Sequence, residues 1–412
     1  MQSELNSTRL RLFANPRVAR TQAYARNGRD AILSLAAFEQ AKREITSWPG
    51  YKPMPLRALS KLAAKAGIGE IFYKDEGGRF GIGSFKALGG AYAVLRLLQR
   101  HILDRRNEQP SSRDLAAGRY ADLTAQVTVT SATDGNHGRS VAWGARTFGA
   151  RCVIYMPDIV SPGRSRAIEA YGAEVRRVAG SFDDAVRQAA ADAAARGWHV
   201  VADTAPDNRS GATRDVMQGY SLMIDEACSQ SAALPSHVFV QGGVGGLAAG
   251  VCAYLWERYG GERPCLVVVE PENADCHFRS AVAGKPTPAA GPFDSIMGGL
   301  ACGEISALAW QILDPGADAF AAIGDDAAIN CMRLLAEGRC GDDPIVAGES
   351  AVAGLAALLL ACADGNARSL LRLLPDSRVL VLGTEGATDT ETYRRIVGCS
   401  PDEVIASREV AS

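Results

Sequence analysis

The feature that most constrains the fold is a regular alternation of apolar segments with helix-patterned segments between residues 127 and 269. The apolar segments are short, and most of them are nearly continuously apolar. Strands of this kind that alternate with helices form parallel sheets that helices cover on both faces. The sequence therefore predicts an α/β protein with strands at 71–76, 127–130, 152–156, 174–178, 199–202, 237–240, 266–269 and 378–382.

Composition and charge narrow the classes of function. The chain has 412 residues, enough for two or three domains, and its net charge of -2 offers no positive field for nucleic acid. No apolar run approaches the ~20 residues that a membrane span needs. Residues 1–26 are rich in arginine and faintly resemble a transit peptide, but a flexible basic arm is the favoured interpretation. Because no apolar signal-peptide core is present, we expect a cytoplasmic protein.

The ten cysteines are scattered along the chain and form no CxxC pair. Most lie in apolar segments, where a thiol behaves as a small buried hydrophobic group. A zinc cluster needs closely spaced cysteine or histidine ligands. The sequence therefore predicts no metal site.

Lys86 is one of only seven lysines in the chain and lies in the glycine-rich segment 83–90. Its neighbours are small or apolar, and such surroundings make it easier for a lysine to lose its proton and act as a nucleophile or Schiff-base former. A lysine at the start of a helix can equally extend its amine into solvent. These eight residues alone leave both interpretations open.

The segment Gly242–Gly246 follows a predicted strand and opens a predicted helix. Residues without side chains let backbone N–H groups surround an anion at a helix N-terminus. The segment lacks the GxGxxG spacing of a dinucleotide fold and has no Walker lysine, so a small phosphorylated cofactor is favoured over ATP or NAD. A tight strand-to-helix turn is the plain alternative.

Polar or glycine-rich segments also follow three other predicted strands. Each of their residues has a structural interpretation, because Asp134 and Asn136 form turns or cap helices and Asp203 can cap the next segment. The carboxyl ends of parallel strands are where α/β proteins bind ligands. Together, a lysine, a phosphate cradle and several acids predict pyridoxal 5'-phosphate (PLP), which needs a Schiff-base lysine and a phosphate site.

Three motifs then resemble the fold-type II PLP enzymes, the group of tryptophan synthase β and threonine dehydratase. They are Ser84-Phe85-Lys86, Asp134-Gly135-Asn136-His137-Gly138 and the segment 242–246, in this order. Further stretches resemble the diaminopropionate ammonia-lyase family, and the likeness covers roughly residues 48–397. These stretches are 49–53, 74–76, 79–81, 132–139, 203–204, 217–220, 299–304, 348–350 and 384–389.

The resemblance implies two domains, each with a twisted and mostly parallel sheet covered by helices, and an active site in the cleft between them. We assign residues 1–88 and 206–412 to a large PLP-binding domain and residues 89–205 to a small domain. The segment 206–211 is the best candidate for a crossing between the domains. The family also implies a homodimer.

Cofactor roles follow from the same resemblance. Lys86 would hold PLP through a Schiff base, with Phe85 packed beside the cofactor. Asn136 would donate a hydrogen bond to its 3' oxygen, and Thr384 would face the pyridine nitrogen. The backbone of five residues would cradle the phosphate: Gly242, Gly243, Val244, Gly245 and Gly246.

The implied reaction is the elimination of both enantiomers of 2,3-diaminopropionate to pyruvate and two ammonia. Lys86 would take the α-proton from the L form and Asp134 from the D form, while Asp203 would bind the β-amino group. Ser131 and Thr133 would contact the substrate. The alternatives are a serine or threonine dehydratase, an amino-acid racemase, elimination from another β-substituted amino acid, or a non-catalytic protein that binds an anion at residues 242–246.

Some residues depart from the family pattern. Pro206-Asp207-Asn208-Arg209 stands where an aromatic residue is usual, and Gly83-Ser84 stands where Asn-Ala is frequent. These departures leave the cofactor chemistry intact and put the substrate in doubt. Cys276 and Cys302 occupy positions where the family also has cysteines, and they could form a disulfide near the site entrance. Reduced thiols are the default in a cytosolic protein.

Overall fold

The computed structural model describes residues 9–133, 135–204 and 211–411. The chain divides into two compact units. The larger unit comprises Met1–Ile32, Pro53–Gly78 and Met223–Ser412, and the smaller unit comprises Leu33–Lys52 and Arg79–Leu222. These limits differ from the predicted domain boundaries at 88/89 and 205/206, of which the second lies outside the described residues. The assignment of functional domains stays a prediction.

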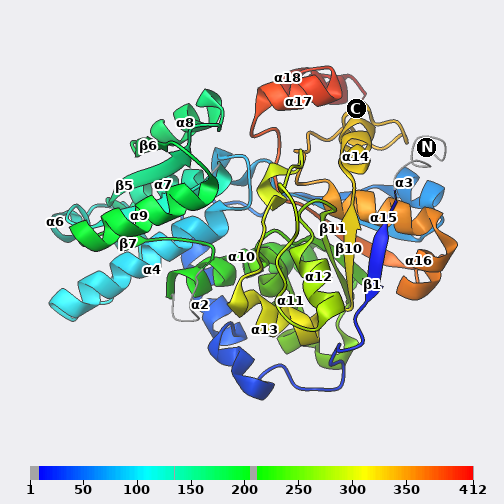
Figure 1. Ribbon diagram of the computed structural model, residues 1–412, viewed down its shortest axis with the longest axis horizontal. Coiled ribbons are helices and arrows are strands. Elements are labelled where there is room, and N and C mark those ends of the chain that lie inside the picture. The colour runs from blue at the N-terminus through cyan, green and yellow to red at the C-terminus, as the bar shows by residue number, and fades with distance from the viewer. Residues whose placement is uncertain (1–8, 134, 205–210, 412) are drawn as a thin grey trace. The chain divides into compact units, whose positions relative to one another are not determined.

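The larger unit contains a seven-stranded sheet in the order β1-β10-β9-β8-β11-β3-β2 (Figure 1). Its five central strands are parallel, and the two outer strands, β1 and β2, run antiparallel to their neighbours. The register pairs Val381 of β11 with Phe239 of β8 and with Tyr73 of β3. The strands are β1 (Arg11–Ala14), β2 (Leu56–Ala58), β3 (Glu70–Asp75), β8 (His237–Gln241), β9 (Cys265–Pro271), β10 (Ala319–Ile323) and β11 (Arg378–Gly383).

Helices bury the apolar faces of this sheet. Helix α15 (Ala353–Ala363) is almost wholly apolar and lies in the core beside the central strands, because every residue from Ala353 to Ala361 is buried. The other helices of the unit are η1 (Arg26–Ala31), α3 (Ser60–Ala66), α11 (Gly246–Tyr259), η3 (Gly260–Glu262), α12 (Cys276–Ala283), η4 (Gly298–Leu300), α13 (Ala307–Gly316), α14 (Asp325–Glu337), α16 (Gly365–Leu371), α17 (Thr390–Val397) and α18 (Pro401–Ala411).

The smaller unit contains a four-stranded parallel sheet in the order β6-β5-β4-β7. Its strands are β4 (Thr128–Ala132), β5 (Arg151–Pro157), β6 (Glu174–Val178) and β7 (His199–Val200). Its helices are α2 (Leu35–Ile45), η2 (Arg79–Gly81), α4 (Ala87–Arg106), α5 (Ser112–Ala116), α6 (Ala121–Thr124), α7 (Asn136–Phe148), α8 (Pro162–Glu169) and α9 (Phe182–Arg196), together with the first part of α10 (Gly211–Gln230). The predicted parallel α/β architecture is thus confirmed in both units.

Two glycines let α4 and α7 approach closely. A Cβ atom on Gly144 would lie 2.6 Å from the Cα atom of Ala91, and one on Gly90 would lie 2.0 Å from Ser140 Oγ. These distances are too short for a side chain, so Gly144 lets the helices meet backbone to backbone and Gly90 makes room for the Ser140 side chain. This contact fixes the start of α4, where Lys86 is located.

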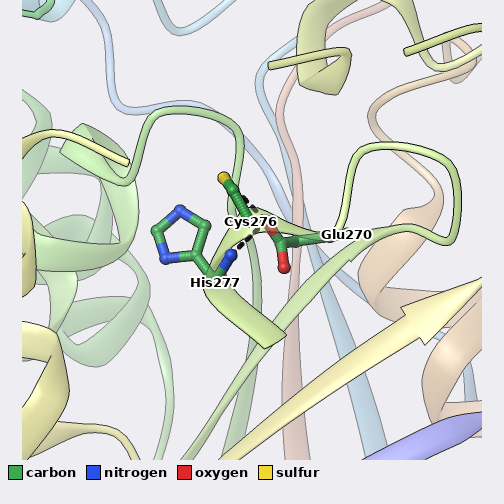
Figure 2. A group of neighbouring side chains, drawn as sticks. All are labelled: Glu270, Cys276 and His277. Atoms are coloured by element: carbon green, nitrogen blue, oxygen red, sulfur yellow. Dashed lines mark hydrogen bonds between the residues drawn. The ribbon is translucent and has the colours of Figure 1, made fainter. Parts of the chain in front are cut away.

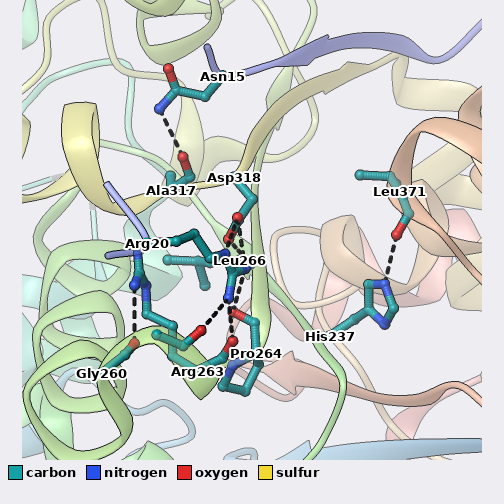
Figure 3. A network of polar contacts seen from close by, with 11 residues as sticks. Asn15, Arg20, His237, Gly260, Arg263, Pro264, Leu266, Ala317, Asp318 and Leu371 are labelled. Atoms are coloured by element: carbon teal, nitrogen blue, oxygen red, sulfur yellow. Dashed lines mark hydrogen bonds and ion pairs between the residues drawn. The ribbon is translucent and has the colours of Figure 1, made fainter. Parts of the chain in front are cut away.

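The sequence predicted a flexible basic arm at the N-terminus. Over residues 9–26 this prediction is wrong, because the segment is held by a strand and by side-chain contacts. Strand β1 pairs antiparallel with β10, with Phe13 opposite Phe320. Beyond it, Arg20 forms an ion pair of 2.6 Å with Asp318, which also accepts a hydrogen bond of 2.8 Å from the Leu266 amide (Figure 3). Asn15 donates to the Ala317 carbonyl at 2.8 Å. The arginines therefore anchor the segment to the larger unit.

Among the described residues, no helix is long and apolar enough to cross a membrane.

Candidate active site

Lys86 lies immediately before α4, at its N-cap position. Its Nζ atom donates a hydrogen bond of 2.9 Å to Oδ2 of Asp203, and both side chains are only partly exposed. Asp203 follows β7, 117 residues along the chain. The smaller unit therefore brings together the predicted Schiff-base lysine and the predicted substrate-binding carboxylate.

Two aromatic rings surround the Lys86 amine. The ring of Phe85 lies 4.6 Å from that of Tyr220, centroid to centroid, and Lys86 Nζ lies 5.5 Å and 5.8 Å from the two ring centroids. A Cβ atom on Gly89 would lie 2.4 Å from the Tyr220 ring, so only glycine at this position leaves room for the ring. Sequence reasoning placed Phe85 at the site but assigned no role to Tyr220, although it lies in the family-like stretch 217–220.

The electrostatic environment keeps Asp203 ionised. Burial raises its pKa, but the charges of Lys86 and His137 and the hydrogen bond from Lys86 outweigh burial and hold the pKa well below its usual range. His137 Nδ1 lies 3.9 Å from Asp203 Oδ2, and His137 Nε2–H donates to the Val201 carbonyl at 2.9 Å. The site therefore presents an ionised carboxylate next to the Lys86 amine.

The loop after β4 is built around Thr133. Its Oγ1 atom accepts hydrogen bonds from the amides of Gly135 and Gly138 at 3.0 and 3.1 Å, which organises the start of α7 at Asn136. The buried Ser131 hydroxyl donates to the Ala132 carbonyl at 3.3 Å. Both hydroxyls thus have structural partners, and their predicted contact with substrate stays a prediction. Asp134 lies outside the described residues.

In the larger unit, the segment Gly242–Gly246 (hereafter the glycine loop) connects β8 to α11. Gly243 and Gly245 have φ angles of 57° and 95°, in the left-handed region that favours glycine. A Cβ atom on Gly242 would lie 2.8 Å from Glu270 Cγ. The loop therefore needs glycine for both conformation and space, and it places backbone amides at the N-terminus of a 14-residue helix.

A buried hydroxyl accompanies the glycine loop. The Ser306 amide, just before α13, donates to the Val244 carbonyl at 2.9 Å. Ser306 Oγ is buried and has no hydrogen-bond partner among the described residues. A glycine-lined helix N-terminus next to an unsatisfied hydroxyl suits a phosphate group, which accepts hydrogen bonds at several oxygens. The residues of the larger unit therefore fit the phosphate of PLP.

Thr384 follows β11, the strand next to β8, so it lies at the same sheet edge as the glycine loop. It is buried. Gln241 links the two strand ends, because its Nε2 atom donates to the carbonyls of Leu382 and Ala351 at 2.6 and 2.8 Å. The larger unit thus brings together the predicted phosphate and ring-nitrogen residues.

The structure draws no disulfide between Cys276 and Cys302, and their pairing stays a prediction. The Cys276 thiol donates a hydrogen bond to Glu270 Oε1 at 3.4 Å. Burial and the neighbouring Glu270 raise the pKa of the Cys276 thiol, which keeps it protonated. The thiolate that disulfide chemistry requires is therefore disfavoured.

The fold, a lysine paired with a carboxylate and a glycine loop that fits a phosphate define an α/β PLP enzyme. Consistent with this, the family described as "Pyridoxal-phosphate dependent enzyme" matches residues 47–384, and the chain belongs to that family.

Within that family, the chain is similar to diaminopropionate ammonia-lyase. It is 40% identical to the enzyme of Escherichia coli (strain K12) over 84% of this chain and 88% of the relative. The E. coli enzyme solved in complex with D-serine has a TM-score of 0.85 at 35% identity, covering 95% of this chain and 97% of that one. Its complex with an aminoacrylate-PLP azomethine reaction intermediate has a TM-score of 0.83 at 35% identity, covering 94% and 97%.

Proposed function

We propose that this protein is a PLP-dependent carbon–nitrogen lyase that eliminates ammonia from 2,3-diaminopropionate and releases pyruvate and two ammonia. The observation that supports this most directly is the Lys86–Asp203 pair, at 2.9 Å, in a chain 40% identical to a diaminopropionate ammonia-lyase. Both the L and the D forms are the proposed substrates.

The carboxylate of Asp203 favours an amine as the leaving group. In the protein without cofactor, burial raises its pKa, but Lys86 and His137 outweigh burial and hold the pKa well below the usual range, which supports an anionic carboxylate. An anionic group of this kind attracts the β-ammonium group of diaminopropionate but gains much less from the neutral hydroxyl of serine or threonine. An anionic carboxylate at this position would therefore select for the diamine.

Lys86 is the proposed base for the L form. Its side chain extends from the start of α4, next to the rings of Phe85 and Tyr220. When it is bound, PLP supplies an electron sink that stabilises the charge left after removal of the α-proton. Asp134 is the proposed base for the D form, on the opposite face.

The cofactor would be held by residues of both units. The amides of the glycine loop would bind its phosphate, Thr384 would face its ring nitrogen, and Asn136 would donate to its 3' oxygen. Lys86 would carry the covalent attachment. The location of the site between two domains stays a prediction from the family resemblance.

The test of the function is direct. Purified protein is incubated with L- and D-2,3-diaminopropionate, and pyruvate is followed with lactate dehydrogenase and NADH. The expected result is pyruvate from both enantiomers at a kcat/KM well above that for L-serine, D-serine or L-threonine. Faster release of a 2-oxo acid from serine or threonine would instead identify a dehydratase, and interconversion of enantiomers without pyruvate would identify a racemase.

We also propose that the enzyme is a cytoplasmic homodimer, as the resemblance to its family implied. Sedimentation equilibrium of the purified protein at micromolar concentration measures its mass. A mass twice the 43.4 kDa of one chain is expected. A single species at the mass of one chain would contradict the dimer.

A further inference from the structure

A buried histidine lies directly beneath the glycine loop. His277 is the second residue of α12 and is fully buried. Its Nε2–H donates a hydrogen bond of 2.9 Å to the Gly243 carbonyl. A carbonyl can only accept, so this contact fixes the tautomer with the proton on Nε2. The imidazole therefore holds the residue at which the loop adopts its left-handed turn.

The same ring fills the space below two other residues of the loop. A Cβ atom on Gly245 would lie 2.8 Å from His277 Cε1, and one on Gly242 would lie 3.1 Å from His277 Cδ2. The ring edge thus runs under the loop from one glycine to the other. Any displacement of the loop toward the sheet meets the imidazole, and any displacement away from it lengthens the Gly243 hydrogen bond.

Glu270 fixes the histidine in turn. This buried residue is on β9, and its two carboxylate oxygens accept the amides of His277 and Phe278 at 3.0 and 2.9 Å. Figure 2 shows the carboxylate at the start of α12, with the imidazole on the far side of the His277 backbone. The chain of contacts therefore runs from the sheet through Glu270 and His277 to the glycine loop.

The imidazole is neutral in this position. Burial lowers its pKa to about 4. His277 Nδ1 is buried and has no hydrogen-bond partner in the described part of the chain. Nε2–H has the Gly243 carbonyl as its acceptor, whereas a proton on Nδ1 would be buried without an acceptor. Burial of such a donor is unfavourable. The neutral ring therefore supports the loop through one donor, the Nε2–H group that binds the Gly243 carbonyl.

The cluster could also be read as a metal site, because Glu270, Cys276 and His277 each offer a ligand atom within 4.8 Å of the others. However, both carboxylate oxygens already accept backbone amides, and His277 Nε2 donates to Gly243. The Nε2–H contact with Gly243 remains whether or not Nδ1 binds a metal ion, so the supporting role does not depend on a metal. Added Zn²⁺ is therefore one arm of the test.

We propose that His277 is a positioning residue that holds the glycine loop in its phosphate-binding conformation and thereby sets the preference of the enzyme for phosphorylated pyridoxal. This rests on the proposed PLP-dependent function. The side chain does not touch the phosphate itself. It acts through the Gly243 carbonyl and through the space that it fills below Gly242 and Gly245.

The test compares PLP with pyridoxal, which lacks the phosphate. Apoprotein is titrated with each compound, and the dissociation constants are measured from quenching of tryptophan fluorescence. In His277→Phe, which keeps the ring and removes the donor, Kd for PLP should rise about tenfold or more, while Kd for pyridoxal changes less than about twofold. His277→Gln, whose amide can donate from a similar position, should recover most of the PLP affinity.

His237 provides the matched control. It is also a buried histidine of the larger unit, and its Nε2–H donates to the Leu371 carbonyl at 2.8 Å (Figure 3). It lies at the first residue of β8, whereas the glycine loop follows the last one. His237→Phe removes an equivalent hydrogen bond and should leave the ratio of the two dissociation constants unchanged.

Three results would overturn or redirect the inference. A folded His277→Phe protein with the wild-type ratio of Kd values would contradict it, and His277→Leu provides the same comparison if the phenylalanine variant does not fold. Wild-type protein that shows no preference for PLP over pyridoxal would contradict the proposed function instead. Wild-type PLP affinity that depends on added Zn²⁺, with the dependence lost in Cys276→Ser, would establish the metal site in place of the support.

Discussion

Lys86 Nζ and Asp203 Oδ2 are joined by a hydrogen bond of 2.9 Å, although 117 residues of chain separate them. The helix start that carries Lys86 and the segment after β7 that carries Asp203 both belong to the smaller unit. The pair couples the group proposed to bind the cofactor with the group proposed to bind the leaving amine. Two of the predictions below separate these roles.

Substitution of Lys86 by arginine should abolish the reaction. A guanidinium keeps the charge beside Asp203 but does not form a Schiff base, so turnover should fall about 10²- to 10⁴-fold. The measurement is pyruvate release, together with borohydride reduction and peptide mapping of the wild-type protein. Lys285→Arg, at an exposed position, is the control. Reduced cofactor on any other lysine would refute the assignment.

Substitution of Asp203 by asparagine should reduce turnover of diaminopropionate more than turnover of serine. The amide removes the charge that attracts the β-ammonium group, so kcat/KM for the diamine should fall about 10²- to 10⁴-fold. Steady-state kinetics with both substrates measure the difference. Asp192→Asn removes an acid bound to Arg176 in the same unit and serves as the control. An equal loss for both substrates would argue against leaving-group selection.

Substitution of Gly245 by alanine should weaken PLP binding. The residue has a φ of 95°, and its new Cβ atom would lie 2.8 Å from both His277 and Ala309. The loop must therefore shift, and the expected rise in Kd for PLP is about tenfold or more. Equilibrium dialysis of the apoprotein gives the value. Gly365→Ala, where nothing lies within 4 Å, is the matched control and should bind PLP normally.

Stability should fall as the pH drops from 6.5 to 4, in part through His277. Its pKa is about 4 in the folded protein, below its usual value of 6.5, so in this window the unfolded chain binds a proton that the folded chain does not. The loss should reach about 3 kcal/mol at pH 4. Urea unfolding of wild type and His277→Gln at both pH values measures it as a difference.

Glu270 makes stability depend on pH in the opposite direction to His277, because burial raises its pKa to about 8. The folded state binds the extra proton between pH 4.5 and 8, so this residue makes stability decrease as the pH rises through that window. Its contribution is common to wild type and His277→Gln and cancels in the comparison. Identical pH dependence of the two proteins would show that His277 is not buried in its neutral form.

Substitution of Arg20 by alanine should destabilise the larger unit. The side chain is partly buried and pairs with Asp318 at 2.6 Å. Loss of hydrogen bonds to a charged group of this kind lowers the free energy of unfolding by about 1–2 kcal/mol. The midpoint of urea denaturation reports the change. Arg187→Ala, which removes a largely exposed pair with Asp184, should shift stability by no more than about 0.5 kcal/mol.

The central strands were predictable because they are apolar on both faces. Strands β1, β2 and β10 were not predicted. β10 reads Ala-Phe-Ala-Ala-Ile, a pattern that also suits a helix, and it becomes a strand because it pairs with β9 and β1. β1 lies in an arginine-rich segment whose strand partner is about 300 residues away in the sequence. Local patterns carry no information about such pairings.

The site residues also divide into those that a local pattern predicts and those that depend on contacts with distant parts of the chain. The Lys86 segment and the glycine loop were found from short local motifs. The role of Asp203 came from the family resemblance. Tyr220, Ser306 and His277 were missed, because their roles depend on which loop they approach in three dimensions. One signal was present for His277. The glycines at 242 and 245 are compatible with a close neighbour of the loop, but they suit a phosphate or a tight turn equally and identify no side chain.

The pairing of β1 with β10 affects the order in which the protein can fold during synthesis. Leu12 pairs with Ala321, so the ribosome must translate more than three-quarters of the chain before β1 has a partner. Most of the smaller unit, by contrast, is the continuous segment Arg79–Leu222. We therefore expect this segment to fold first on the ribosome, while an arginine-rich leading end waits for its strand partner to be translated.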